Sequence, residues 1–377
     1  MDVLFIGGTG RLSKDTAALA SQCGMNVTLL TRGSSDRAIF APTNCELLQG
    51  DIRDAGACRQ LLSGRKFDVV VDYLSYITPQ LENTLNIVME HCLQFVFVSS
   101  ATVYKPCSDS TLISEKSAAI GNQEWQYAWN KFLCEKLLAE YSEENGIEYT
   151  IVRPYVTYGN TRVPYPLVPF DNSKEWSFVE RIGLGLPIPT FDGGCTQTTL
   201  THTKDFAKGM VGLFGNDLAY GEDFHITNDE HVTWNMTIDA LEEALGLKAI
   251  RTDVPREYLY EKLPEYKPVV EGDKGRIMRF DSSKIRAAVP SFSCEIKLAD
   301  GIADMIEFYE GHPELKRIDW VWMGKMDRLL LGKKEARSAR ALYDFHTFEN
   351  KMRYISGYYG ALDNIVSWAK KALERLG

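Results

Sequence analysis

The stretch Val3-Leu4-Phe5-Ile6-Gly7-Gly8-Thr9-Gly10-Arg11-Leu12-Ser13 decides which fold the sequence predicts. Its first four residues form an unbroken apolar run, which is typical of a parallel strand covered by helices on both faces. A glycine-rich turn follows directly, and a helical pattern then runs to Cys23 and ends at Gly24. The segment therefore predicts a strand, a tight turn and a helix in immediate succession.

The turn has the residue types that a phosphate-binding loop requires. Gly7, Gly10 and Ser13 are small, so the backbone can turn sharply and approach a pyrophosphate, while the N–H groups of the next helix face its charge. Glycines that only close a turn are the alternative, but the place between a strand and a helix favours binding of a dinucleotide cofactor. The predicted cofactor-binding residues of this loop are Gly7, Thr9, Gly10, Arg11 and Leu12.

The same alternation of apolar runs and helical patterns continues through the first half of the chain. Repeated strand–helix alternation indicates parallel βαβ units with right-handed crossovers. We therefore expect an α/β protein with a Rossmann-type doubly wound parallel sheet. The further strands are predicted at 27–30, 45–48, 67–73, 95–98 and 149–152, and the clearest helices at 81–92 and 127–144.

Regularity falls after Arg153-Pro154, where prolines cluster, and this composition is typical of loops that leave a sheet. A helical pattern at 203–214 and a strand pattern at 223–227 indicate a return to the sheet. We predict a Rossmann domain at 1–160 plus about 200–230, a smaller substrate lobe at 161–199 plus 231–315, and a helical extension at 316–377.

Composition excludes several classes of protein. The chain has 377 residues with 42 Lys+Arg against 51 Asp+Glu, so its net charge of -9 opposes binding to nucleic acid or to an anionic membrane. No apolar run approaches the roughly 18 residues of a membrane helix. The eight cysteines form no Cys-x-x-Cys pair, and the six histidines show no ligand spacing, so we expect free thiols, no metal and a cytoplasmic protein. The basic helical stretch 333–340 is typical of a solvated face, and pairing with an acidic surface of the same chain or of a second subunit in a homodimer is the alternative.

Tyr127 and Lys131 form the most reactive pair in the sequence. Their spacing of four places them on one face of a helix, where an ammonium group one turn away stabilises a phenolate. Such a pair also occurs by chance on solvated helices. The predicted strand at 95–98 is followed by Ser99 and Ser100, and hydroxyls at the carboxyl end of a parallel strand lie where such sheets bind ligands. One of these hydroxyls can hold a substrate oxygen while Tyr127 moves a proton.

Together these motifs resemble the extended short-chain dehydrogenase/reductase family, which contains nucleotide-sugar epimerases and dehydratases. The resemblance covers roughly residues 2–290. It implies a catalytic triad of Ser100, Tyr127 and Lys131, with Lys131 also holding the nicotinamide ribose and Asp51 contacting the adenine end. A simple loop cap is the alternative for Asp51. The motifs are the Gly7–Ser13 loop, Gly50-Asp51-Ile52, Ser99–Tyr104, Tyr127-x-x-x-Lys131, Arg153–Gly159 and His202–Asp205, with Ile52 and Pro154 as further cofactor-binding residues.

The departures from the family pattern refine the expected reaction. Dehydratases of this family carry an Asp-Glu pair where this chain has Ala101 and Thr102, so an epimerase or a ketoreductase is favoured over a dehydratase. Nucleotide-sugar epimerases usually have an arginine where this chain has Thr198. A nucleotide-sugar substrate would therefore need other partners for its diphosphate, among which Arg162, Lys204, Arg276 and Arg279 are candidates.

The expected activity is NAD(P)-dependent oxidation and reduction of a hydroxyl or carbonyl carbon on a sugar-like small molecule. A non-catalytic NAD(P)-binding relative with a regulatory or RNA-associated role is the alternative. NADP is the expected cofactor and NAD the second choice, because the strand at 27–30 is followed by Arg32 rather than by the usual carboxylate. Ser34, Ser35 and Arg11 would join Arg32 around a 2′-phosphate. Stacking of Arg32 on the adenine ring, which is possible with either cofactor, is the alternative.

Overall fold

Two compact units make up the chain. The computed structural model describes residues 1–33, 41–105, 112–116, 118 and 120–360. The first, here called the sheet unit, contains residues 1–159, 197–232 and 270–297. The second, here called the helical unit, contains the described residues 160–196, 233–269 and 298–360. Each unit is therefore assembled from three separate segments of the sequence.

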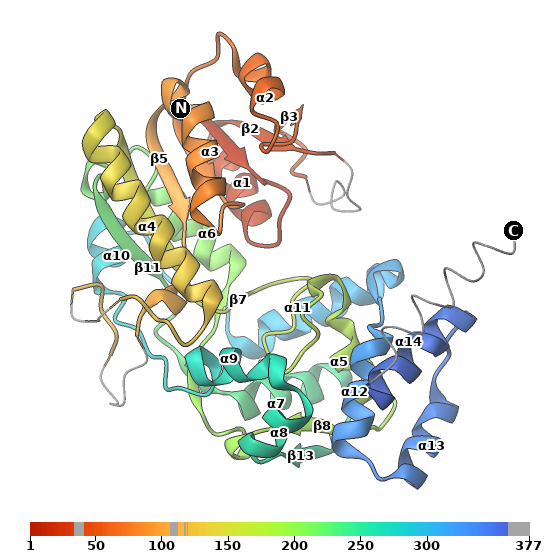
Figure 1. Cartoon of the computed structure of the whole chain (residues 1–377). Helices are drawn as coiled ribbons and strands as arrows, with labels where there is room; N and C mark the ends of the chain where they lie inside the picture. The colour runs from red at the N-terminus through yellow and green to blue at the C-terminus, as the bar shows by residue number, and fades with distance from the viewer. Residues whose placement is uncertain (34–40, 106–111, 117, 119, 361–377) are drawn as a thin grey trace, which may run out of the picture. The chain divides into compact units, whose positions relative to one another are not determined.

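A seven-stranded, fully parallel sheet forms the centre of the sheet unit (Figure 1). The strand order is β11-β6-β5-β4-β1-β2-β3, so the chain starts in the middle of the sheet and reverses direction beside β1. Because all strands are parallel, their carboxyl ends share one edge, which is where such sheets bind ligands. The strands are β1 Asp2–Ile6, β2 Asn26–Thr31, β3 Glu46–Gln49, β4 Phe67–Asp72, β5 Cys92–Val98, β6 Glu148–Pro154 and β11 Glu222–Ile226.

Helices cover both faces of this sheet, as the unbroken apolar run of β1 predicts. Val3 and Phe5 belong to a core shared with α1 (Ser13–Gln22) and α6 (Thr203–Gly212). The alternate residues Leu4 and Ile6 point into a second core on the opposite face. That core is shared with α2 Ala55–Leu62, α3 Thr78–Val88 and α4 Gln126–Asn145. The doubly wound Rossmann-type sheet is thus confirmed.

The sequence places one boundary wrongly, at Cys92. The pattern predicts a helix through this residue, but α3 ends at Val88 and Cys92 opens β5. Cys92 pairs with Phe67 of β4, so a long-range strand contact outweighs the local helical pattern. The return of the chain to the sheet is confirmed, because β11 pairs with β6 at its edge.

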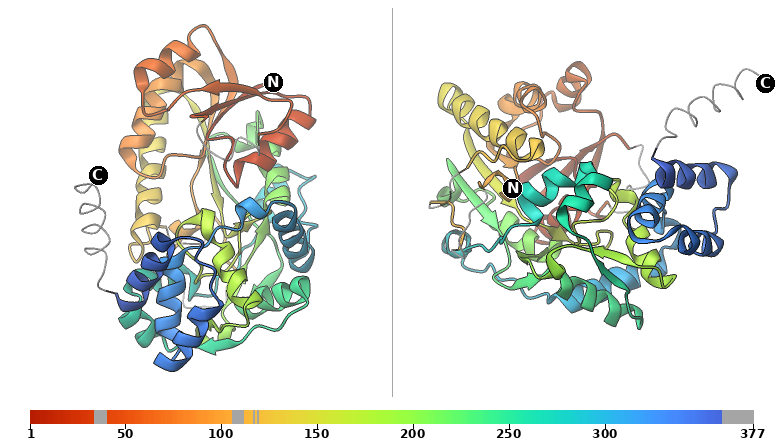
Figure 2. Two further views of the ribbon diagram at one scale, coloured as in Figure 1. Left: turned by 90° about the vertical axis from the view of Figure 1, so that its right-hand side faces the viewer. Right: turned by 60° about the horizontal axis from the view of Figure 1, so that its bottom comes forward.

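A buried ion pair organises the helical unit. The guanidinium of Arg181 in α5 (Trp176–Gly183) donates to Asp327 in α12 (Trp320–Leu330) at 2.7 Å, and both side chains are fully buried. The hydroxyls of Tyr343 and Tyr354 also donate to Asp327. The predicted helical character after residue 316 is confirmed up to residue 360, and both views of Figure 2 show these last helices, in blue, packed together.

The remaining α-helices and short strands have the following bounds. They are β7 Thr157–Tyr158, β8 Ile188–Thr190, β9 Gln197–Thr199, β10 Thr201–His202, β12 His231–Thr233, β13 Arg251–Asp253, α7 Trp234–Leu245, α8 Arg256–Lys262, α9 Lys267–Val269, α10 Ser283–Ala288, α11 Leu298–Gly311, α13 Lys333–Leu342 and α14 Phe348–Tyr359. Among the described residues, every helix is too short or too polar to span a lipid bilayer.

Candidate active site

The loop between β1 and α1 is shaped so that only glycine fits at its start. Gly7 has a φ of +86°, a left-handed conformation that residues with a side chain rarely adopt. A β-carbon on Gly7 would lie 2.6 Å from Leu74, and one on Gly8 would lie 2.4 Å from Leu29. The start of this loop is therefore packed closely against the side chains of Leu29 in β2 and of Leu74, which follows β4.

Ser13 has a defined role at the third small position of the loop. Its hydroxyl donates to the carbonyl of Gly7 at 2.7 Å and accepts from the N–H of Gly10 at 2.9 Å, so it fixes the turn from inside. Leu12 precedes α1 and provides no side-chain cap for the helix. The first N–H groups of α1 are thus not capped by a side chain at the point where a phosphate would bind. These observations fit a dinucleotide pyrophosphate.

Positive charge gathers around this loop. Lys14 is buried, and this burial lowers the pKa of its ammonium group, with Asp15 acting in the opposite direction. Arg11 and Lys204 lie close enough to lower the pKa of Lys14 further. Thr203 donates to the Asp15 carboxylate at 2.5 Å and so joins the N-terminus of α6 to α1. The loop is therefore suited electrostatically to an anion.

Lys131 reaches from α4 to the carboxyl ends of two central strands. Its ammonium group donates to the backbone carbonyls of Ser75 and Val98, each at 2.7 Å, and it lies 4.8 Å from the centre of the Phe97 ring. The side chain is 4% exposed. Burial lowers the pKa of Lys131 to about 8, and the Asp72 carboxylate acts against this shift. Lys131 is thus fixed beside the segment that follows β4 and the segment that follows β5.

Tyr127 lies on the same helix as this lysine, and Ser100 lies two residues after Val98, whose carbonyl accepts from Lys131. Tyr127 is the second residue of α4, one turn before Lys131; its ring lies 5.0 Å from that of Trp125 and it is partly exposed. Ser100 follows β5 by two residues, and its hydroxyl accepts hydrogen bonds from the N–H and the hydroxyl of Thr102. The helix therefore carries the phenol and the amine on one face, and β5 leads directly to the hydroxyl.

Asn122 and Ser75 are polar residues of this region that the sequence analysis missed. The side-chain amide of Asn122 donates to the carbonyls of Thr102 and Gly272, which joins the segment after β5 to a distant part of the sheet unit. Ser75 contributes only its backbone carbonyl to Lys131. A backbone acceptor and a long-range amide contact have no local sequence pattern. Nothing in the sequence could therefore have identified either contact.

The residues predicted for the adenine end follow β2 and β3 at the same edge of the sheet. Arg32 follows β2 and is exposed, and its carbonyl accepts from the side chain of Gln49. Asp51 pairs with Arg53 at 2.5 Å, and the hydrogen bonds from Arg53 hold the pKa of Asp51 at about 2. Ile52 is buried. Ser34 and Ser35, the other residues predicted to lie around a 2′-phosphate on this segment, lie outside the described residues.

Two further positions have structural contacts. Pro154 is the last residue of β6, where it pairs with Ile226 of β11. His202, the first residue of the His202–Asp205 motif, is buried, and its Nδ1 accepts from the N–H of Lys204, so it caps the N-terminus of α6. Among the described residues, no group of three or more His, Cys, Asp and Glu is arranged to hold a metal ion.

Known proteins resemble this chain in sequence and in structure. A family model described as the NAD dependent epimerase/dehydratase family matches residues 3–226. The chloroplast stem-loop binding protein of 41 kDa b from Arabidopsis thaliana is 28% identical over 260 residues, which cover 65% of this chain. The match spans 63% of that relative, less than two thirds of its length.

Solved structures share the fold at low sequence identity. Epimerase Mth375 from Methanothermobacter thermautotrophicus has a TM-score of 0.70 and 16% identity, covering 84% of this chain and 94% of that one. The UDP-glucuronic acid 4-epimerase from Bacillus cereus in complex with NAD has a TM-score of 0.65 and 16% identity, covering 84% and 100%. At these identities the likeness shows a common fold.

Proposed function

Because this chain belongs to the NAD dependent epimerase/dehydratase family, we propose that it is an NAD(P)-dependent epimerase or ketoreductase acting on a sugar-like substrate. One observation carries the proposal: α4 places Lys131 against the carboxyl ends of β4 and β5, one helical turn after Tyr127. A dinucleotide lying on the Gly7 loop has its reactive end at this edge of a Rossmann sheet. The lysine and tyrosine are therefore in the region where the chemistry occurs.

The proposed roles follow from the chemistry of each side chain. When bound, the nicotinamide ring supplies the site that takes or returns a hydride. Tyr127 takes the proton from the substrate hydroxyl, or returns it to the carbonyl oxygen, and Ser100 donates a hydrogen bond to that same oxygen. Lys131 is a cation below its pKa of about 8, so it stabilises the phenolate of Tyr127 and donates to a ribose hydroxyl.

We expect Tyr127→Phe to test this assignment directly. The substitution keeps the ring but removes the proton that moves, so turnover should fall by about 10²- to 10⁴-fold. The dissociation constant of the cofactor should stay within about twofold, because binding does not use that proton. Tyr141→Phe on the same helix is the matched control and should keep its turnover. Near-normal turnover in Tyr127→Phe would rule out Tyr127 as the acid/base.

Lys131→Ala should weaken both turnover and cofactor binding.

The two candidate reactions differ in the fate of the hydride. An epimerase returns the hydride to the same substrate molecule, so it needs no net supply of reduced cofactor. A ketoreductase consumes one reduced cofactor for each product. An alcohol substrate with deuterium at the reacting carbon, supplied together with oxidised cofactor, distinguishes them. Retention of the label in the product indicates an epimerase, and transfer of the label to free cofactor, with formation of the ketone, indicates a ketoreductase. Neighbours of this fold bind UDP-sugars, so UDP-glucose and UDP-glucuronic acid are the first substrates to try.

A second candidate function rests on the stem-loop binding relative. The name of that relative says that it binds a stem-loop, so the second candidate is a protein of this fold that binds an RNA stem-loop. The net charge of -9 opposes this function, because affinity for nucleic acid depends mainly on Lys and Arg contacts to phosphates. Binding of an RNA stem-loop at physiological salt, combined with no turnover of any sugar, would favour it. Turnover that is lost in Tyr127→Phe would favour the enzyme.

A further inference from the structure

A buried ion pair lies one helical turn beyond Lys131. Arg153 in β6 donates to Glu135 in α4 through two nitrogens: Nε to Oε1 at 2.9 Å and Nη2 to Oε2 at 2.7 Å. Both side chains are 4% exposed. Two parallel hydrogen bonds between a guanidinium and a carboxylate fix the direction as well as the distance of the pair. Glu135 is therefore held in one position relative to β6.

The same carboxylate contacts the residue next to the proposed catalytic serine. The Ser99 hydroxyl donates to Oε1 of Glu135 at 2.5 Å, and the N–H of Ser99 donates to the carbonyl of Val152 in β6. Ser99 directly precedes Ser100, whose hydroxyl points to Thr102 instead. Glu135 thus joins three elements, namely α4, the end of β5 and β6. Any displacement of Glu135 would change the distance between the helix and the serine.

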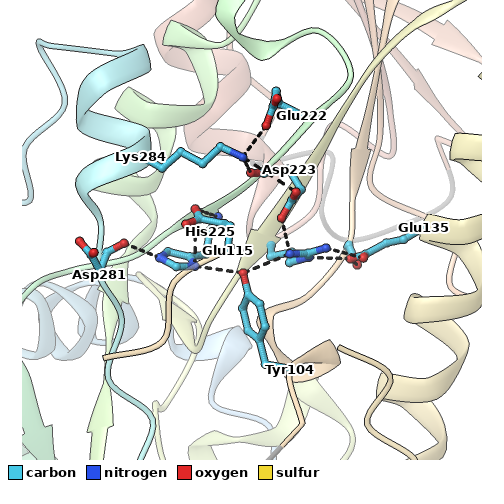
Figure 3. A network of polar contacts seen from close by, with 10 residues as sticks. Tyr104, Glu115, Glu135, Glu222, Asp223, His225, Asp281 and Lys284 are labelled. Carbon is cyan, nitrogen blue, oxygen red and sulfur yellow. Dashed lines mark hydrogen bonds and ion pairs between the residues drawn. The ribbon is translucent and has the colours of Figure 1, made fainter. Parts of the chain in front are cut away.

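Further polar groups contact the arginine on its other side (Figure 3). The guanidinium of Arg153 also donates to the Tyr104 hydroxyl at 3.1 Å and pairs with Asp223 in β11. Tyr104 contacts Nδ1 of His225 at 3.1 Å, and Nε2 of His225 contacts the carbonyl of Asp281 at 2.8 Å. Figure 3 shows Glu135 at one end of this chain of contacts and Asp281 at the other.

Tyr127, Lys131 and Glu135 follow one another at intervals of four residues on α4, so they share one face of the helix. The groups that face Lys131 are Asp72 at the end of β4, Cys134 and Glu135 from its own helix, and the ring of Phe97 from β5. Of these, Glu135 is the charged group that is itself clamped by partners from two other elements.

We propose that Glu135 is a positioning residue for Lys131. Because Arg153 and Ser99 hold its carboxylate, Glu135 fixes the distance between α4 and the end of β5, and it provides a fixed negative charge beside the lysine. The proposal rests on the proposed function, because it gives Glu135 a purpose only if Lys131 acts in the reaction. Arg153 and Ser99 act through Glu135 and are positioning residues in the same sense. None of the three contacts a reacting atom.

Titration of Lys131 tests the proposal without any cofactor. Lysines labelled with carbon-13 at Cε are followed by NMR from pH 6 to 10, and the signal of Lys131 is identified by its loss in Lys131→Ala. Burial already lowers the pKa of Lys131 to about 8. Glu135→Gln removes a neighbouring negative charge, which disfavours the ammonium form, so we expect the pKa to fall by about one further unit. Glu222→Gln at the exposed edge of the same cluster is the control and should leave the Lys131 titration unchanged.

Glu135→Asp guards against a variant that fails to fold, because it keeps the charge of the pair with Arg153 and only withdraws the carboxylate by one methylene. We expect this variant to fold and to lower the pKa of Lys131 in the same direction by less than Glu135→Gln. A Lys131 titration within about 0.3 units of the wild type in every folded Glu135 variant would overturn the proposal.

Cofactor affinity across pH separates this proposal from the proposed function. The ammonium group of Lys131 has three N–H donors, of which two bond to the carbonyls of Ser75 and Val98. Deprotonation removes the third donor, which would bond to the ribose, so wild-type affinity should weaken as the pH rises through about 8. In Glu135→Gln the weakening should begin at lower pH, with up to about tenfold lower affinity at pH 8 and near-normal affinity at pH 6. A loss of the same size at every pH would indicate damage to the fold and contradict positioning through charge. Absence of cofactor binding by the wild type would refute the proposed function, while the Lys131 titration would still decide the role of Glu135.

Discussion

Arg32 is the single residue on which the proposed choice of cofactor depends. It directly follows β2, where an acidic side chain would bind the ribose 2′-hydroxyl of NAD, and it is exposed. A hydrogen bond to a charged group contributes roughly 1.5–3 kcal/mol, or about 10- to 100-fold in affinity. We therefore expect Arg32→Ala to weaken NADP binding by about that factor and to leave NAD binding almost unchanged. Calorimetric titration of both cofactors measures this. Equal affinity of the wild type for NAD and NADP would contradict the expectation.

His225 makes the stability of the sheet unit depend on pH. Burial lowers its pKa to about 4, and Nε2 donates to the Asp281 carbonyl while Nδ1 accepts from Tyr104. A proton on Nδ1 would face the Tyr104 oxygen and the charge of Arg153, while the Glu115 carboxylate, 3.6 Å from Nδ1, acts in the opposite direction. Because the unfolded chain binds this proton at about pH 6.5, the free energy of unfolding rises with pH between about 4 and 6.5.

We expect the wild type to lose roughly 3 kcal/mol of unfolding free energy through His225 as the pH falls from about 6.5 to 4. His225→Asn keeps an acceptor for Tyr104 but cannot titrate, so its unfolding free energy should depend less on pH in this range. Urea unfolding at several pH values measures the difference. His346→Asn, at an exposed position, is the control and should keep the wild-type dependence. An unchanged pH dependence in His225→Asn would show that other groups cause it.

At the residue scale, the sequence predicted which residue types a site needs better than it predicted which residues contact one another. The spacing of Gly7, Gly10 and Ser13 was enough to indicate a phosphate loop, but not that the Ser13 hydroxyl would bond inside it. The interval of four between Lys131 and Glu135 was visible, yet the partners that give Glu135 its position come from β5 and β6. Roles for Ser100, Tyr127 and Lys131 stay predictions until variants are measured.

Among the elements of the helical unit, α12 and α14 cross with their backbones in close contact. A β-carbon on Gly357 would lie 2.0 Å from the carbonyl oxygen of Val321, and one on Gly324 would lie 2.2 Å from that of Tyr354. We expect Gly357→Ala to lower the free energy of unfolding by roughly 1–3 kcal/mol, because the two backbones must move apart. Thermal unfolding followed by circular dichroism measures this.

Gly311→Ala is the matched control for that prediction. Gly311 ends α11, and a β-carbon there would meet nothing within 4 Å. Alanine has the higher helix propensity, so this substitution should be neutral or stabilise the protein by up to about 1 kcal/mol. If both substitutions had the same effect, close approach of α12 and α14 would not explain the glycines.

Element types could be predicted where local pattern and tertiary pairing agree. The fully buried run of β1 and the helix ended by Gly24 are examples, since Gly24 adopts a φ of +81°. The prediction failed at Cys92, where pairing with β4 decides the structure. The glycine contacts of α12 and α14 could not be predicted, because their partners are distant in the sequence and share no periodic pattern with them.

The whole molecule shows most clearly what a sequence cannot specify. The central sheet follows from the repeated alternation of strands and helices in the first half of the chain, so the fold class could be predicted from the sequence. The segment 270–297 belongs to the sheet unit although it follows a long stretch of the helical unit. One contact that attaches this segment is the hydrogen bond from the Asn122 side chain to the Gly272 carbonyl. The two residues are 150 positions apart in the sequence, so local composition cannot predict the contact.

A crystal structure of the protein with NADP bound tests the central claim most directly. The account predicts the pyrophosphate on the Gly7–Ser13 loop at the N-terminus of α1, and the nicotinamide ribose within hydrogen-bonding distance of Lys131 and Tyr127. It also predicts that the reactive face of the ring lies beside Ser100. A cofactor that binds with its nicotinamide away from Lys131 and Tyr127, or no cofactor density at saturating concentration, would contradict it.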